Sequence, residues 1–273
     1  MNQRSNISTS LGKKRRRSFL KRVFAYLVFI LFFICLGVYV LTTEKARIKS
    51  IDVSGNVSVF SEDIVKIVND EIGINYLWII PTDNIILLRR YQIKNDILEN
   101  IKKISSVKII YKGVDKIEIH VTEREIKSLW CDGTPVVSKS CYFIDKSGFI
   151  FEQAPTFSSD TYFKFFGLIK GVDPIGQFYF KNNFSDIYSL FDTLKNMSFK
   201  LKYFIAKDEH EYEIYLLGDG KILINDKKSF ESSLLNLRAL IDSGYIKTDT
   251  DSIKKIKYID LRFGNKVNFE FNK

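Results

Sequence analysis

The chain has 273 residues, of which 14% are aromatic, and its 42 Lys and Arg against 32 Asp and Glu give a net charge of +10. Eight of the basic residues lie in residues 1–22, which leaves 34 basic against 32 acidic residues in the rest of the chain. Nucleic-acid binding needs a basic face on a folded domain, so the near-neutral remainder argues against that function.

Residues 23–41 form an uncharged run that is rich in Phe, Leu, Ile and Val. A helix of this length rises about 30 Å, the thickness of the hydrocarbon core of a bilayer, so we predict a membrane-spanning helix. The basic tail, residues 1–22, is predicted to be disordered and, by the positive-inside rule, cytoplasmic. A cleaved signal peptide is the alternative, but the apolar run is longer than usual and Thr42-Thr43-Glu44-Lys45 is a poor cleavage site.

Just beyond this helix, residues 46–122 have the periodicity of a small α/β domain. The pattern predicts a strand, two helices and a β-hairpin, at residues 48–54, 61–72, 91–103, 107–111 and 116–121. This order resembles a POTRA domain, a module that lies beside membranes and holds partner polypeptides.

The residues that follow sharpen the resemblance. The segment from Val121 to Trp130 is similar to the E-R-x-P-x-A-x-W hinge of the FtsQ/DivIB family of bacterial cell-division proteins, and Glu123, Arg124 and Trp130 match it. Ile126 stands where the family usually has Pro, and Ser128 stands where it usually has Ala. The resemblance implies a domain hinge here, in which Glu123 and Arg124 have the role of a structural ion pair.

Residues 123–273 resemble the β domain of the same family. Tyr142–Phe151 reads as a strand, an Asp-x-x-Gly turn and a second strand, and Tyr258–Phe263 matches the closing I-D-[LM]-R-[FY] strand of the family. Between them, helices are predicted near 185–194 and 228–241, with strands near 200–206, 211–217 and 221–225. The whole chain is therefore predicted to be α+β: a single membrane helix, a POTRA domain and a mixed β domain with flanking helices.

The sequence offers no set of residues for catalysis, for a cofactor or for a metal. His120 alternates onto a solvated strand face, and His210 lies in an acidic turn with no other histidine or cysteine nearby. No nucleophile or metalloprotease spacing is present, so we expect a protein that is not an enzyme and binds no small-molecule substrate.

A sheet-rich protein of this kind can bind a partner by offering the edge of a terminal strand. Val267, Phe269 and Phe271 alternate onto one face of the last predicted strand, and we expect a charge at Phe269 to leave the fold intact. The family resemblance implies that FtsB-like and FtsL-like partners dock here by strand addition, with Arg262 and Phe263 flanking the site. Packing within the sheet is the alternative role for Phe263.

Cys131 and Cys141 lie outside the membrane helix with nine residues between them, and the sequence leaves a disulfide and two free thiols as equal alternatives. The resemblance implies a divisome scaffold in the inner membrane at the division septum, with further membrane division proteins as partners of the POTRA domain. A POTRA protein of outer-membrane assembly or secretion and a membrane-anchored cell-wall enzyme are the two alternatives.

Overall fold

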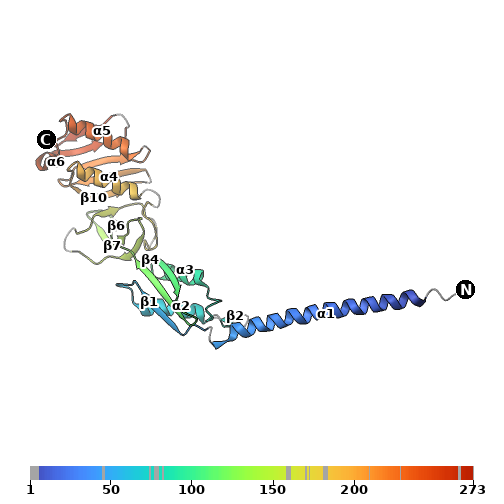
Figure 1. Cartoon of the computed structure of the whole chain (residues 1–273). Coiled ribbons are helices and arrows are strands. Elements are labelled where there is room, and N and C mark those ends of the chain that lie inside the picture. Colours follow the sequence, from blue (N-terminus) through green and yellow to red (C-terminus); the bar gives the residue numbers. More distant parts are fainter. Residues whose placement is uncertain are drawn as a thin grey trace. The chain divides into compact units, whose positions relative to one another are not determined.

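The computed structural model describes residues 6–44, 47–73, 75–76, 80–81, 83–157, 161–169, 171, 173–180, 184–208, 210–227, 229–263 and 266–272. The chain divides into two compact units, residues 1–123 and 124–273, and the division falls between Glu123 and Arg124. Each unit is described by itself below (Figure 1).

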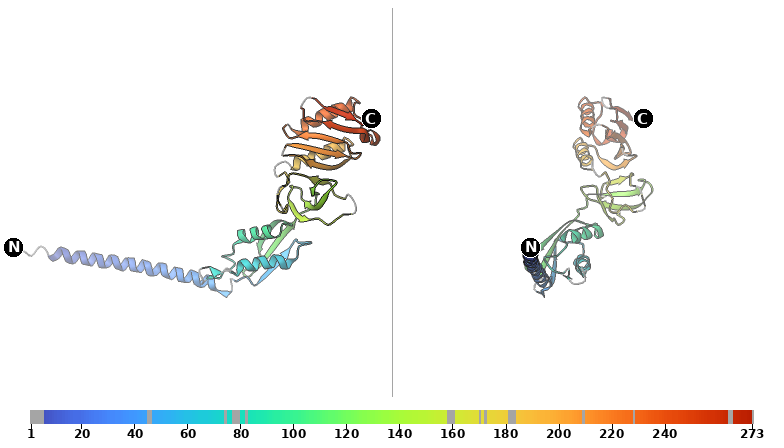
Figure 2. Two further views of the ribbon diagram at one scale, coloured as in Figure 1. Left: turned by 180° about the vertical axis from the view of Figure 1, so that it is seen from behind. Right: turned by 90° about the vertical axis from the view of Figure 1, so that its right-hand side faces the viewer.

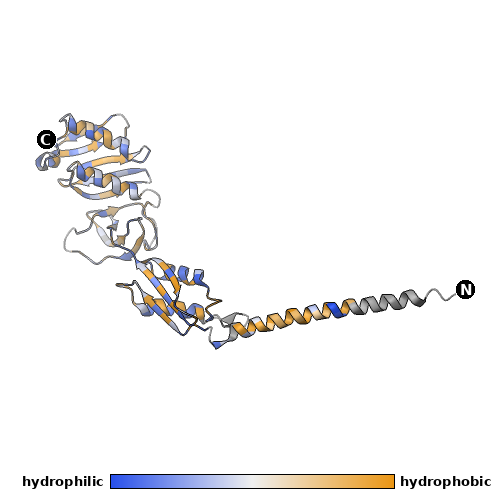
Figure 3. Ribbon diagram, viewed as in Figure 1, coloured by the Kyte–Doolittle hydropathy of each residue, from blue (hydrophilic) through white to orange (hydrophobic). Residues whose placement is uncertain are grey.

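The first unit begins with helix α1 (Asn6–Thr42). Its stretch Phe19–Val40 is long and apolar enough to cross a membrane, and none of this stretch is buried inside the protein. Figure 3 shows the apolar stretch as a nearly continuous hydrophobic ribbon. Aromatic and aliphatic side chains that are exposed all around a helix are stable in lipid, which is consistent with a single-pass membrane anchor.

The basic tail differs from its prediction, because residues 6–22 continue α1 and are not disordered. Lys, Arg and Leu are good helix formers, and a helix that is already nucleated gains one hydrogen bond for each residue added. The lack of an apolar face therefore did not prevent helix formation here. Residues 1–5 lie outside the described part of the chain.

The rest of the first unit is a three-stranded sheet with two helices, in the strand order β1-β5-β4. Strand β1 pairs parallel to β5, and β4 and β5 form an antiparallel hairpin. The elements are β1 (Ser50–Ser54), α2 (Ser61–Ile72), β2 (Asn75–Tyr76), β3 (Ile80–Pro81), α3 (Arg90–Asn100), β4 (Ile104–Tyr111) and β5 (Lys116–Glu123). The predicted order of strand, helix, helix, strand and strand is confirmed.

The core of this domain forms between the helices and one face of the sheet. Alternation along β5 buries Ile117, Ile119 and Val121, and the helical spacing of Ile64 and Val68 places both against them. His120 lies on the opposite face, where its Nδ1 is 3.0 Å from the Ser54 hydroxyl, so it is half-buried rather than fully solvated as expected.

The second unit contains one nine-stranded mixed sheet, in the order β14-β13-β12-β11-β10-β9-β6-β7-β8. The pairs β6–β9, β9–β10 and β12–β13 are parallel, and the other pairs are antiparallel. The strands are β6 (Ser128–Gly133), β7 (Ser138–Ile144), β8 (Ile150–Gln153), β9 (Lys164–Phe166), β10 (Leu201–Ala206), β11 (Glu211–Leu216), β12 (Lys221–Asn225), β13 (Ile256–Asp260) and β14 (Asn268–Phe271).

Helices α4 (Phe184–Asn196) and α5 (Phe230–Asp242) lie on the same face of this sheet, and the short α6 (Thr250–Lys255) precedes β13 (Figures 1 and 2). The main core lies beneath α4 and α5, where Leu190, Leu194, Leu234 and Leu237 meet the inward side chains of the strands. The α+β prediction is confirmed, and burial alternates along β11 and β12 as the sequence pattern required.

Cys131 and Cys141 are directly opposite each other on β6 and β7 and form a disulfide with an S–S distance of 2.00 Å. Cys131 is fully buried in a second cluster, with Leu129 and Phe143. The structure thus gives the disulfide where the sequence left two alternatives.

Candidate functional site

The outer edge of β14 is the first feature of the candidate site. The Asn272 N–H donates to the Lys255 carbonyl at 2.7 Å, so the backbone of Asn272 points toward β13. Backbone groups alternate along a strand, and the register pairs Asn268 with Asp260 and Glu270 with Tyr258. The N–H and C=O groups of Phe269 and Phe271 therefore point outward, where no described strand or loop pairs with them.

Side chains on β14 divide between the core and the surface. Val267 and Phe269 are half-buried and pack against the main core, and Phe269 lies opposite the fully buried Ile259. Phe271 is 39% exposed, and its ring centroid is 5.7 Å from that of Phe269. This packing against the core argues against the expectation that a charge at Phe269 would leave the fold intact.

Arg262 and Phe263 lie at the end of β13, beside the same edge. The Arg262 guanidinium donates to both carboxylate oxygens of Asp260, at 2.9 and 2.7 Å, and to Glu211 Oε2 at 3.1 Å. These hydrogen bonds, chiefly those to Asp260, raise the pKa of Arg262 above its already high ordinary value. Arg262 is thus a permanently charged group that two carboxylates hold in place, and it is only partly exposed.

Phe263 is 58% exposed, and the guanidinium carbon of Arg262 lies 5.7 Å from the centre of its ring. An aromatic ring exposed to this degree beside an unpaired strand is more typical of a contact surface than of a folded core. Packing within the sheet, the alternative role for Phe263, is less compatible with this exposure.

The opposite edge of the sheet, β8, is closed in a way that the sequence did not indicate. The Ile150 N–H donates to the Gln177 carbonyl at 2.9 Å, and the Gly176 N–H donates to the Ile150 carbonyl at 2.8 Å. The ring of Phe178 covers Phe149 at a centroid distance of 4.9 Å. Residues 176–178 therefore satisfy the backbone groups of Ile150, the first residue of β8.

Glu123, at the end of β5, fixes the loop that follows β1 within the first unit. Its carboxylate accepts the backbone N–H groups of Val57, Ser58 and Val59 at 2.6–2.9 Å, together with the Ser58 hydroxyl. Partial burial would raise the pKa of Glu123, but these hydrogen bonds outweigh it and lower the pKa to about 2. Glu123 is therefore an anchor for residues 57–59.

Arg124 contacts two residues of the second unit: its Nη1 lies 2.5 Å from Asp145 Oδ2, and its guanidinium stacks 4.0 Å from the centre of the Phe149 ring. Asp145 begins the Asp-x-x-Gly turn, and its other oxygen accepts the N–H groups of Ser147 and Phe149 at 2.7 and 3.1 Å. The indole N–H of Trp130, in β6, donates to the Gly167 carbonyl at 3.0 Å. The three hinge candidates are thus not brought into one cluster.

In the part of the chain that the structure describes, no group of three or more His, Cys, Asp and Glu side chains is placed to hold a metal ion. His210 instead bonds to Asp226 at 2.8 Å, and the backbone N–H groups of His210 and Glu211 donate to Asp208. This turn is satisfied by its own hydrogen bonds.

A β-α-α-β-β domain that follows one helix able to cross a membrane is consistent with a membrane-anchored POTRA protein. Comparison with family models identifies a POTRA domain of the FtsQ type at residues 46–124. A search of curated proteins found no match. The match is limited to residues 46–124, and it supports a division-associated, FtsQ-like protein of the FtsQ/DivIB family.

Proposed function

We propose that this protein is a scaffold of the bacterial divisome that binds an FtsB-like protein, itself paired with an FtsL-like protein, by strand addition to β14. The observation that carries the proposal is the open edge at Phe269 and Phe271, at the end of the sheet opposite β8. Strand addition to such an edge satisfies backbone groups of both chains and is a common mode of peptide recognition. The FtsQ-type POTRA domain favours division over a role in secretion.

The side chains around the edge indicate what the incoming strand must contain. On the face that carries Phe269 and Phe271, the incoming residues extend the cluster under α5 and should be apolar. On the other face they lie beside Asn268 and Glu270, where Glu270 accepts from Lys257 at 3.0 Å, and should be polar. The partner segment is therefore an alternating strand of about four to six residues.

The Arg262 guanidinium is held by Asp260 of β13 and Glu211 of β11, on the inner side of β14 and not at its outer edge. Because Asp260 and Glu211 already accept its hydrogen bonds, a partner carboxylate would add to a satisfied group and would contribute about 1 kcal/mol or less. In this proposal Arg262 mainly orients Phe263, and the exposed Phe263 ring supplies the apolar contact next to the strand.

The same proposal gives the chain a type II topology. The basic residues of positions 1–22, most of them in the first part of α1, lie on the cytoplasmic side, and the two domains lie outside the cell membrane at the division septum. The open strand β4 of the POTRA domain, with Ile110 and Tyr111 both exposed, is a second surface for membrane division proteins. The FtsQ-type POTRA family is a non-enzymatic scaffold family, and we propose that this chain likewise catalyses no reaction.

The substitution Phe271→Pro tests strand addition most sharply. Proline removes the outward N–H of residue 271 without touching a bond to β13, since that N–H points away from the sheet. We expect the full chain in lipid nanodiscs to bind the host FtsB-like protein about tenfold more weakly after this change, because one edge hydrogen bond and the contact of the ring are lost.

Two variants serve as controls for this experiment. Phe271→Ala removes the ring but keeps the N–H, and should weaken binding about threefold. Tyr91→Ala changes an aromatic side chain that is 78% exposed in the first unit and should not alter binding. Equal affinities of Phe271→Pro and the unchanged chain, measured with folded protein, would refute strand addition at β14.

A further inference from the structure

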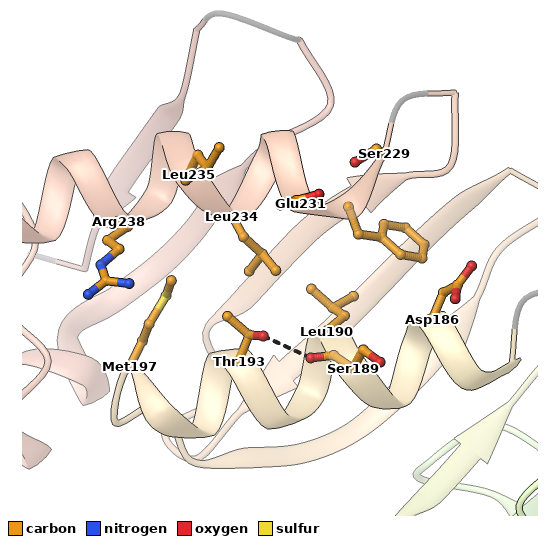
Figure 4. Close-up of a pocket in the computed structure, with 11 residues that line it drawn as sticks. Asp186, Ser189, Leu190, Thr193, Met197, Ser229, Glu231, Leu234, Leu235 and Arg238 are labelled. Carbon is orange, nitrogen blue, oxygen red and sulfur yellow. Dashed lines mark hydrogen bonds between the residues drawn. The ribbon is translucent and has the colours of Figure 1, made fainter.

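Helices α4 and α5 form the two walls of a groove of about 590 Å³ on the covered face of the second sheet. Figure 4 shows Leu190 and Leu234 directed into the space between the helices, and Phe230 also lines the groove. Leu190 and Leu234 are nearly buried and form the floor, whereas Leu235 on the α5 wall is 63% exposed. The apolar surface that the groove offers to an occupant is therefore chiefly that of Leu235 and the half-buried Phe230.

The hydroxyl groups of the α4 wall do not need hydrogen bonds from an occupant of the groove. The Thr193 hydroxyl donates to the Ser189 carbonyl at 2.9 Å, and the Ser189 hydroxyl donates to the Ser185 carbonyl at 3.1 Å. Both hydroxyls are thus satisfied within their own helix, and the surface they leave toward the groove is largely carbon.

Charge is distributed unequally along the groove. Asp186 and Glu231 lie at the end where both helices begin, and Arg238 lies at the other end beside Met197 (Figure 4). Arg238 has only a distant contact with Asp242, at 4.0 Å between two side chains that are about 70% exposed. Such an exposed pair is weak, so Arg238 can exchange it for a partner carboxylate at little cost.

We propose that this groove binds an amphipathic α-helix of a partner protein. A helix fits because both walls are helices whose backbone groups are already paired, and an added strand would find no backbone partner there. The occupant presents apolar side chains at positions i, i+4 and i+7. It carries a Lys or Arg at the end beside Asp186 and Glu231, and an Asp or Glu at the end beside Arg238.

The length of the groove sets the length of the occupant. From Asp186 to Met197 helix α4 advances by eleven residues, or about 17 Å, which corresponds to three helical turns. This site is separate from the open edge of β14, because the residues of the groove belong to α4, to α5 and to the segment before α5.

The test uses three fluorescein-labelled helical peptides of about twelve residues, which share one stripe of leucines at i, i+4 and i+7. They differ only at their ends, which carry Lys and Glu, Lys and Lys, or Glu and Glu. Binding to the full chain in nanodiscs is measured by fluorescence anisotropy. We expect the Lys/Glu peptide to bind about fivefold more tightly than the Glu/Glu peptide, and this preference to fall at high salt.

The variant Arg238→Glu should transfer the preference to the Lys/Lys peptide, because both ends of the groove are then acidic. Leu235→Glu should weaken every peptide about tenfold by placing a charge on the apolar wall. The matched control is Leu217→Glu, which changes a side chain that is 45% exposed outside the groove and should leave binding unchanged.

Three results would overturn the proposal: no binding of any peptide, equal binding of all three, or an unchanged preference in Arg238→Glu. The groove would instead be assigned to a second copy of the chain if no peptide binds and the chain self-associates in a way that Leu235→Glu abolishes. Phe271→Pro should leave peptide affinity unaltered, so failure of strand addition and failure of helix docking are distinguishable.

Discussion

The two edges of the second sheet differ in how their backbone groups are satisfied. At β8, residues 176–178 supply hydrogen bonds and an aromatic cover, and Ile150 is fully buried. At β14, Phe269 and Phe271 direct backbone groups outward, and Phe271 is 39% exposed. An exposed edge can pair with another chain, so β14, with outward backbone groups at both phenylalanines, is the stronger candidate for binding a partner strand.

The largest expected effect comes from disturbing the closed edge at Gly148. This residue has a φ of +85°, and a Cβ placed there would lie 2.3 Å from the Tyr179 carbonyl oxygen, which is backbone. Gly148→Ala should therefore destabilise the second unit by about 3 kcal/mol, measured by chemical denaturation. The neighbouring exposed variant Lys146→Ala should cost less than about 0.5 kcal/mol, and equal effects of the two changes would contradict the role given to the turn.

A smaller effect separates two phenylalanines of the open edge. Phe269→Ala should lower the free energy of unfolding by about 2 kcal/mol, because its ring packs against the main core. Phe271→Ala should lower it by less than about 1 kcal/mol, because much of that ring is in solvent. Similar losses from both variants in equilibrium denaturation would show that β14 does not orient these rings as described.

The smallest expected effect extends the comparison to the first unit. There the carboxylate of Glu123, and not another backbone segment, accepts the backbone N–H groups of a loop. The folded pKa of Glu123, about 2, lies below the ordinary value of about 4.3 expected for the unfolded chain. Glu123 therefore contributes stability above pH about 4.3, and the contribution is lost as the pH falls through about 2.

Glu123→Gln tests this dependence on pH. Allowing for solvent screening, the variant should be about 1 kcal/mol less stable at pH 7, and the difference should shrink at pH 3. Thermal unfolding at the two pH values measures it, with Glu125→Gln as a control at a neighbouring exposed carboxylate. A difference that grows on acidification would contradict the assigned hydrogen bonds.

Much of the fold could be predicted because local patterns and packing agree. The alternation in Lys116–Glu123 and the helical spacing of Ile64 and Val68 gave the POTRA elements, and the match of residues 46–124 to an FtsQ-type POTRA domain supports the family. The position of β14 at an edge was expected because a terminal strand often lies there.

Other features depend on contacts between distant residues that no local pattern carries. Alternation places Phe269 and Phe271 on one face but does not say that α5 covers that face near Phe269. Residues 176–178 have no strand pattern, so their closure of β8 could not be read from the sequence. The groove between α4 and α5 was likewise hidden, because leucines at helical spacing are typical of any core.

The most direct test of the open edge is hydrogen exchange of individual backbone amides in the full chain, with and without the host FtsB-like protein. We predict fast exchange at Phe269 and Phe271 in the free chain and protection of both amides in the complex. The amides of Ile150 and Tyr179, which already donate to Gln177 and Gly148, should be protected in both states. Amides of Phe269 and Phe271 that exchange equally fast in the presence of bound partner would contradict strand addition at β14.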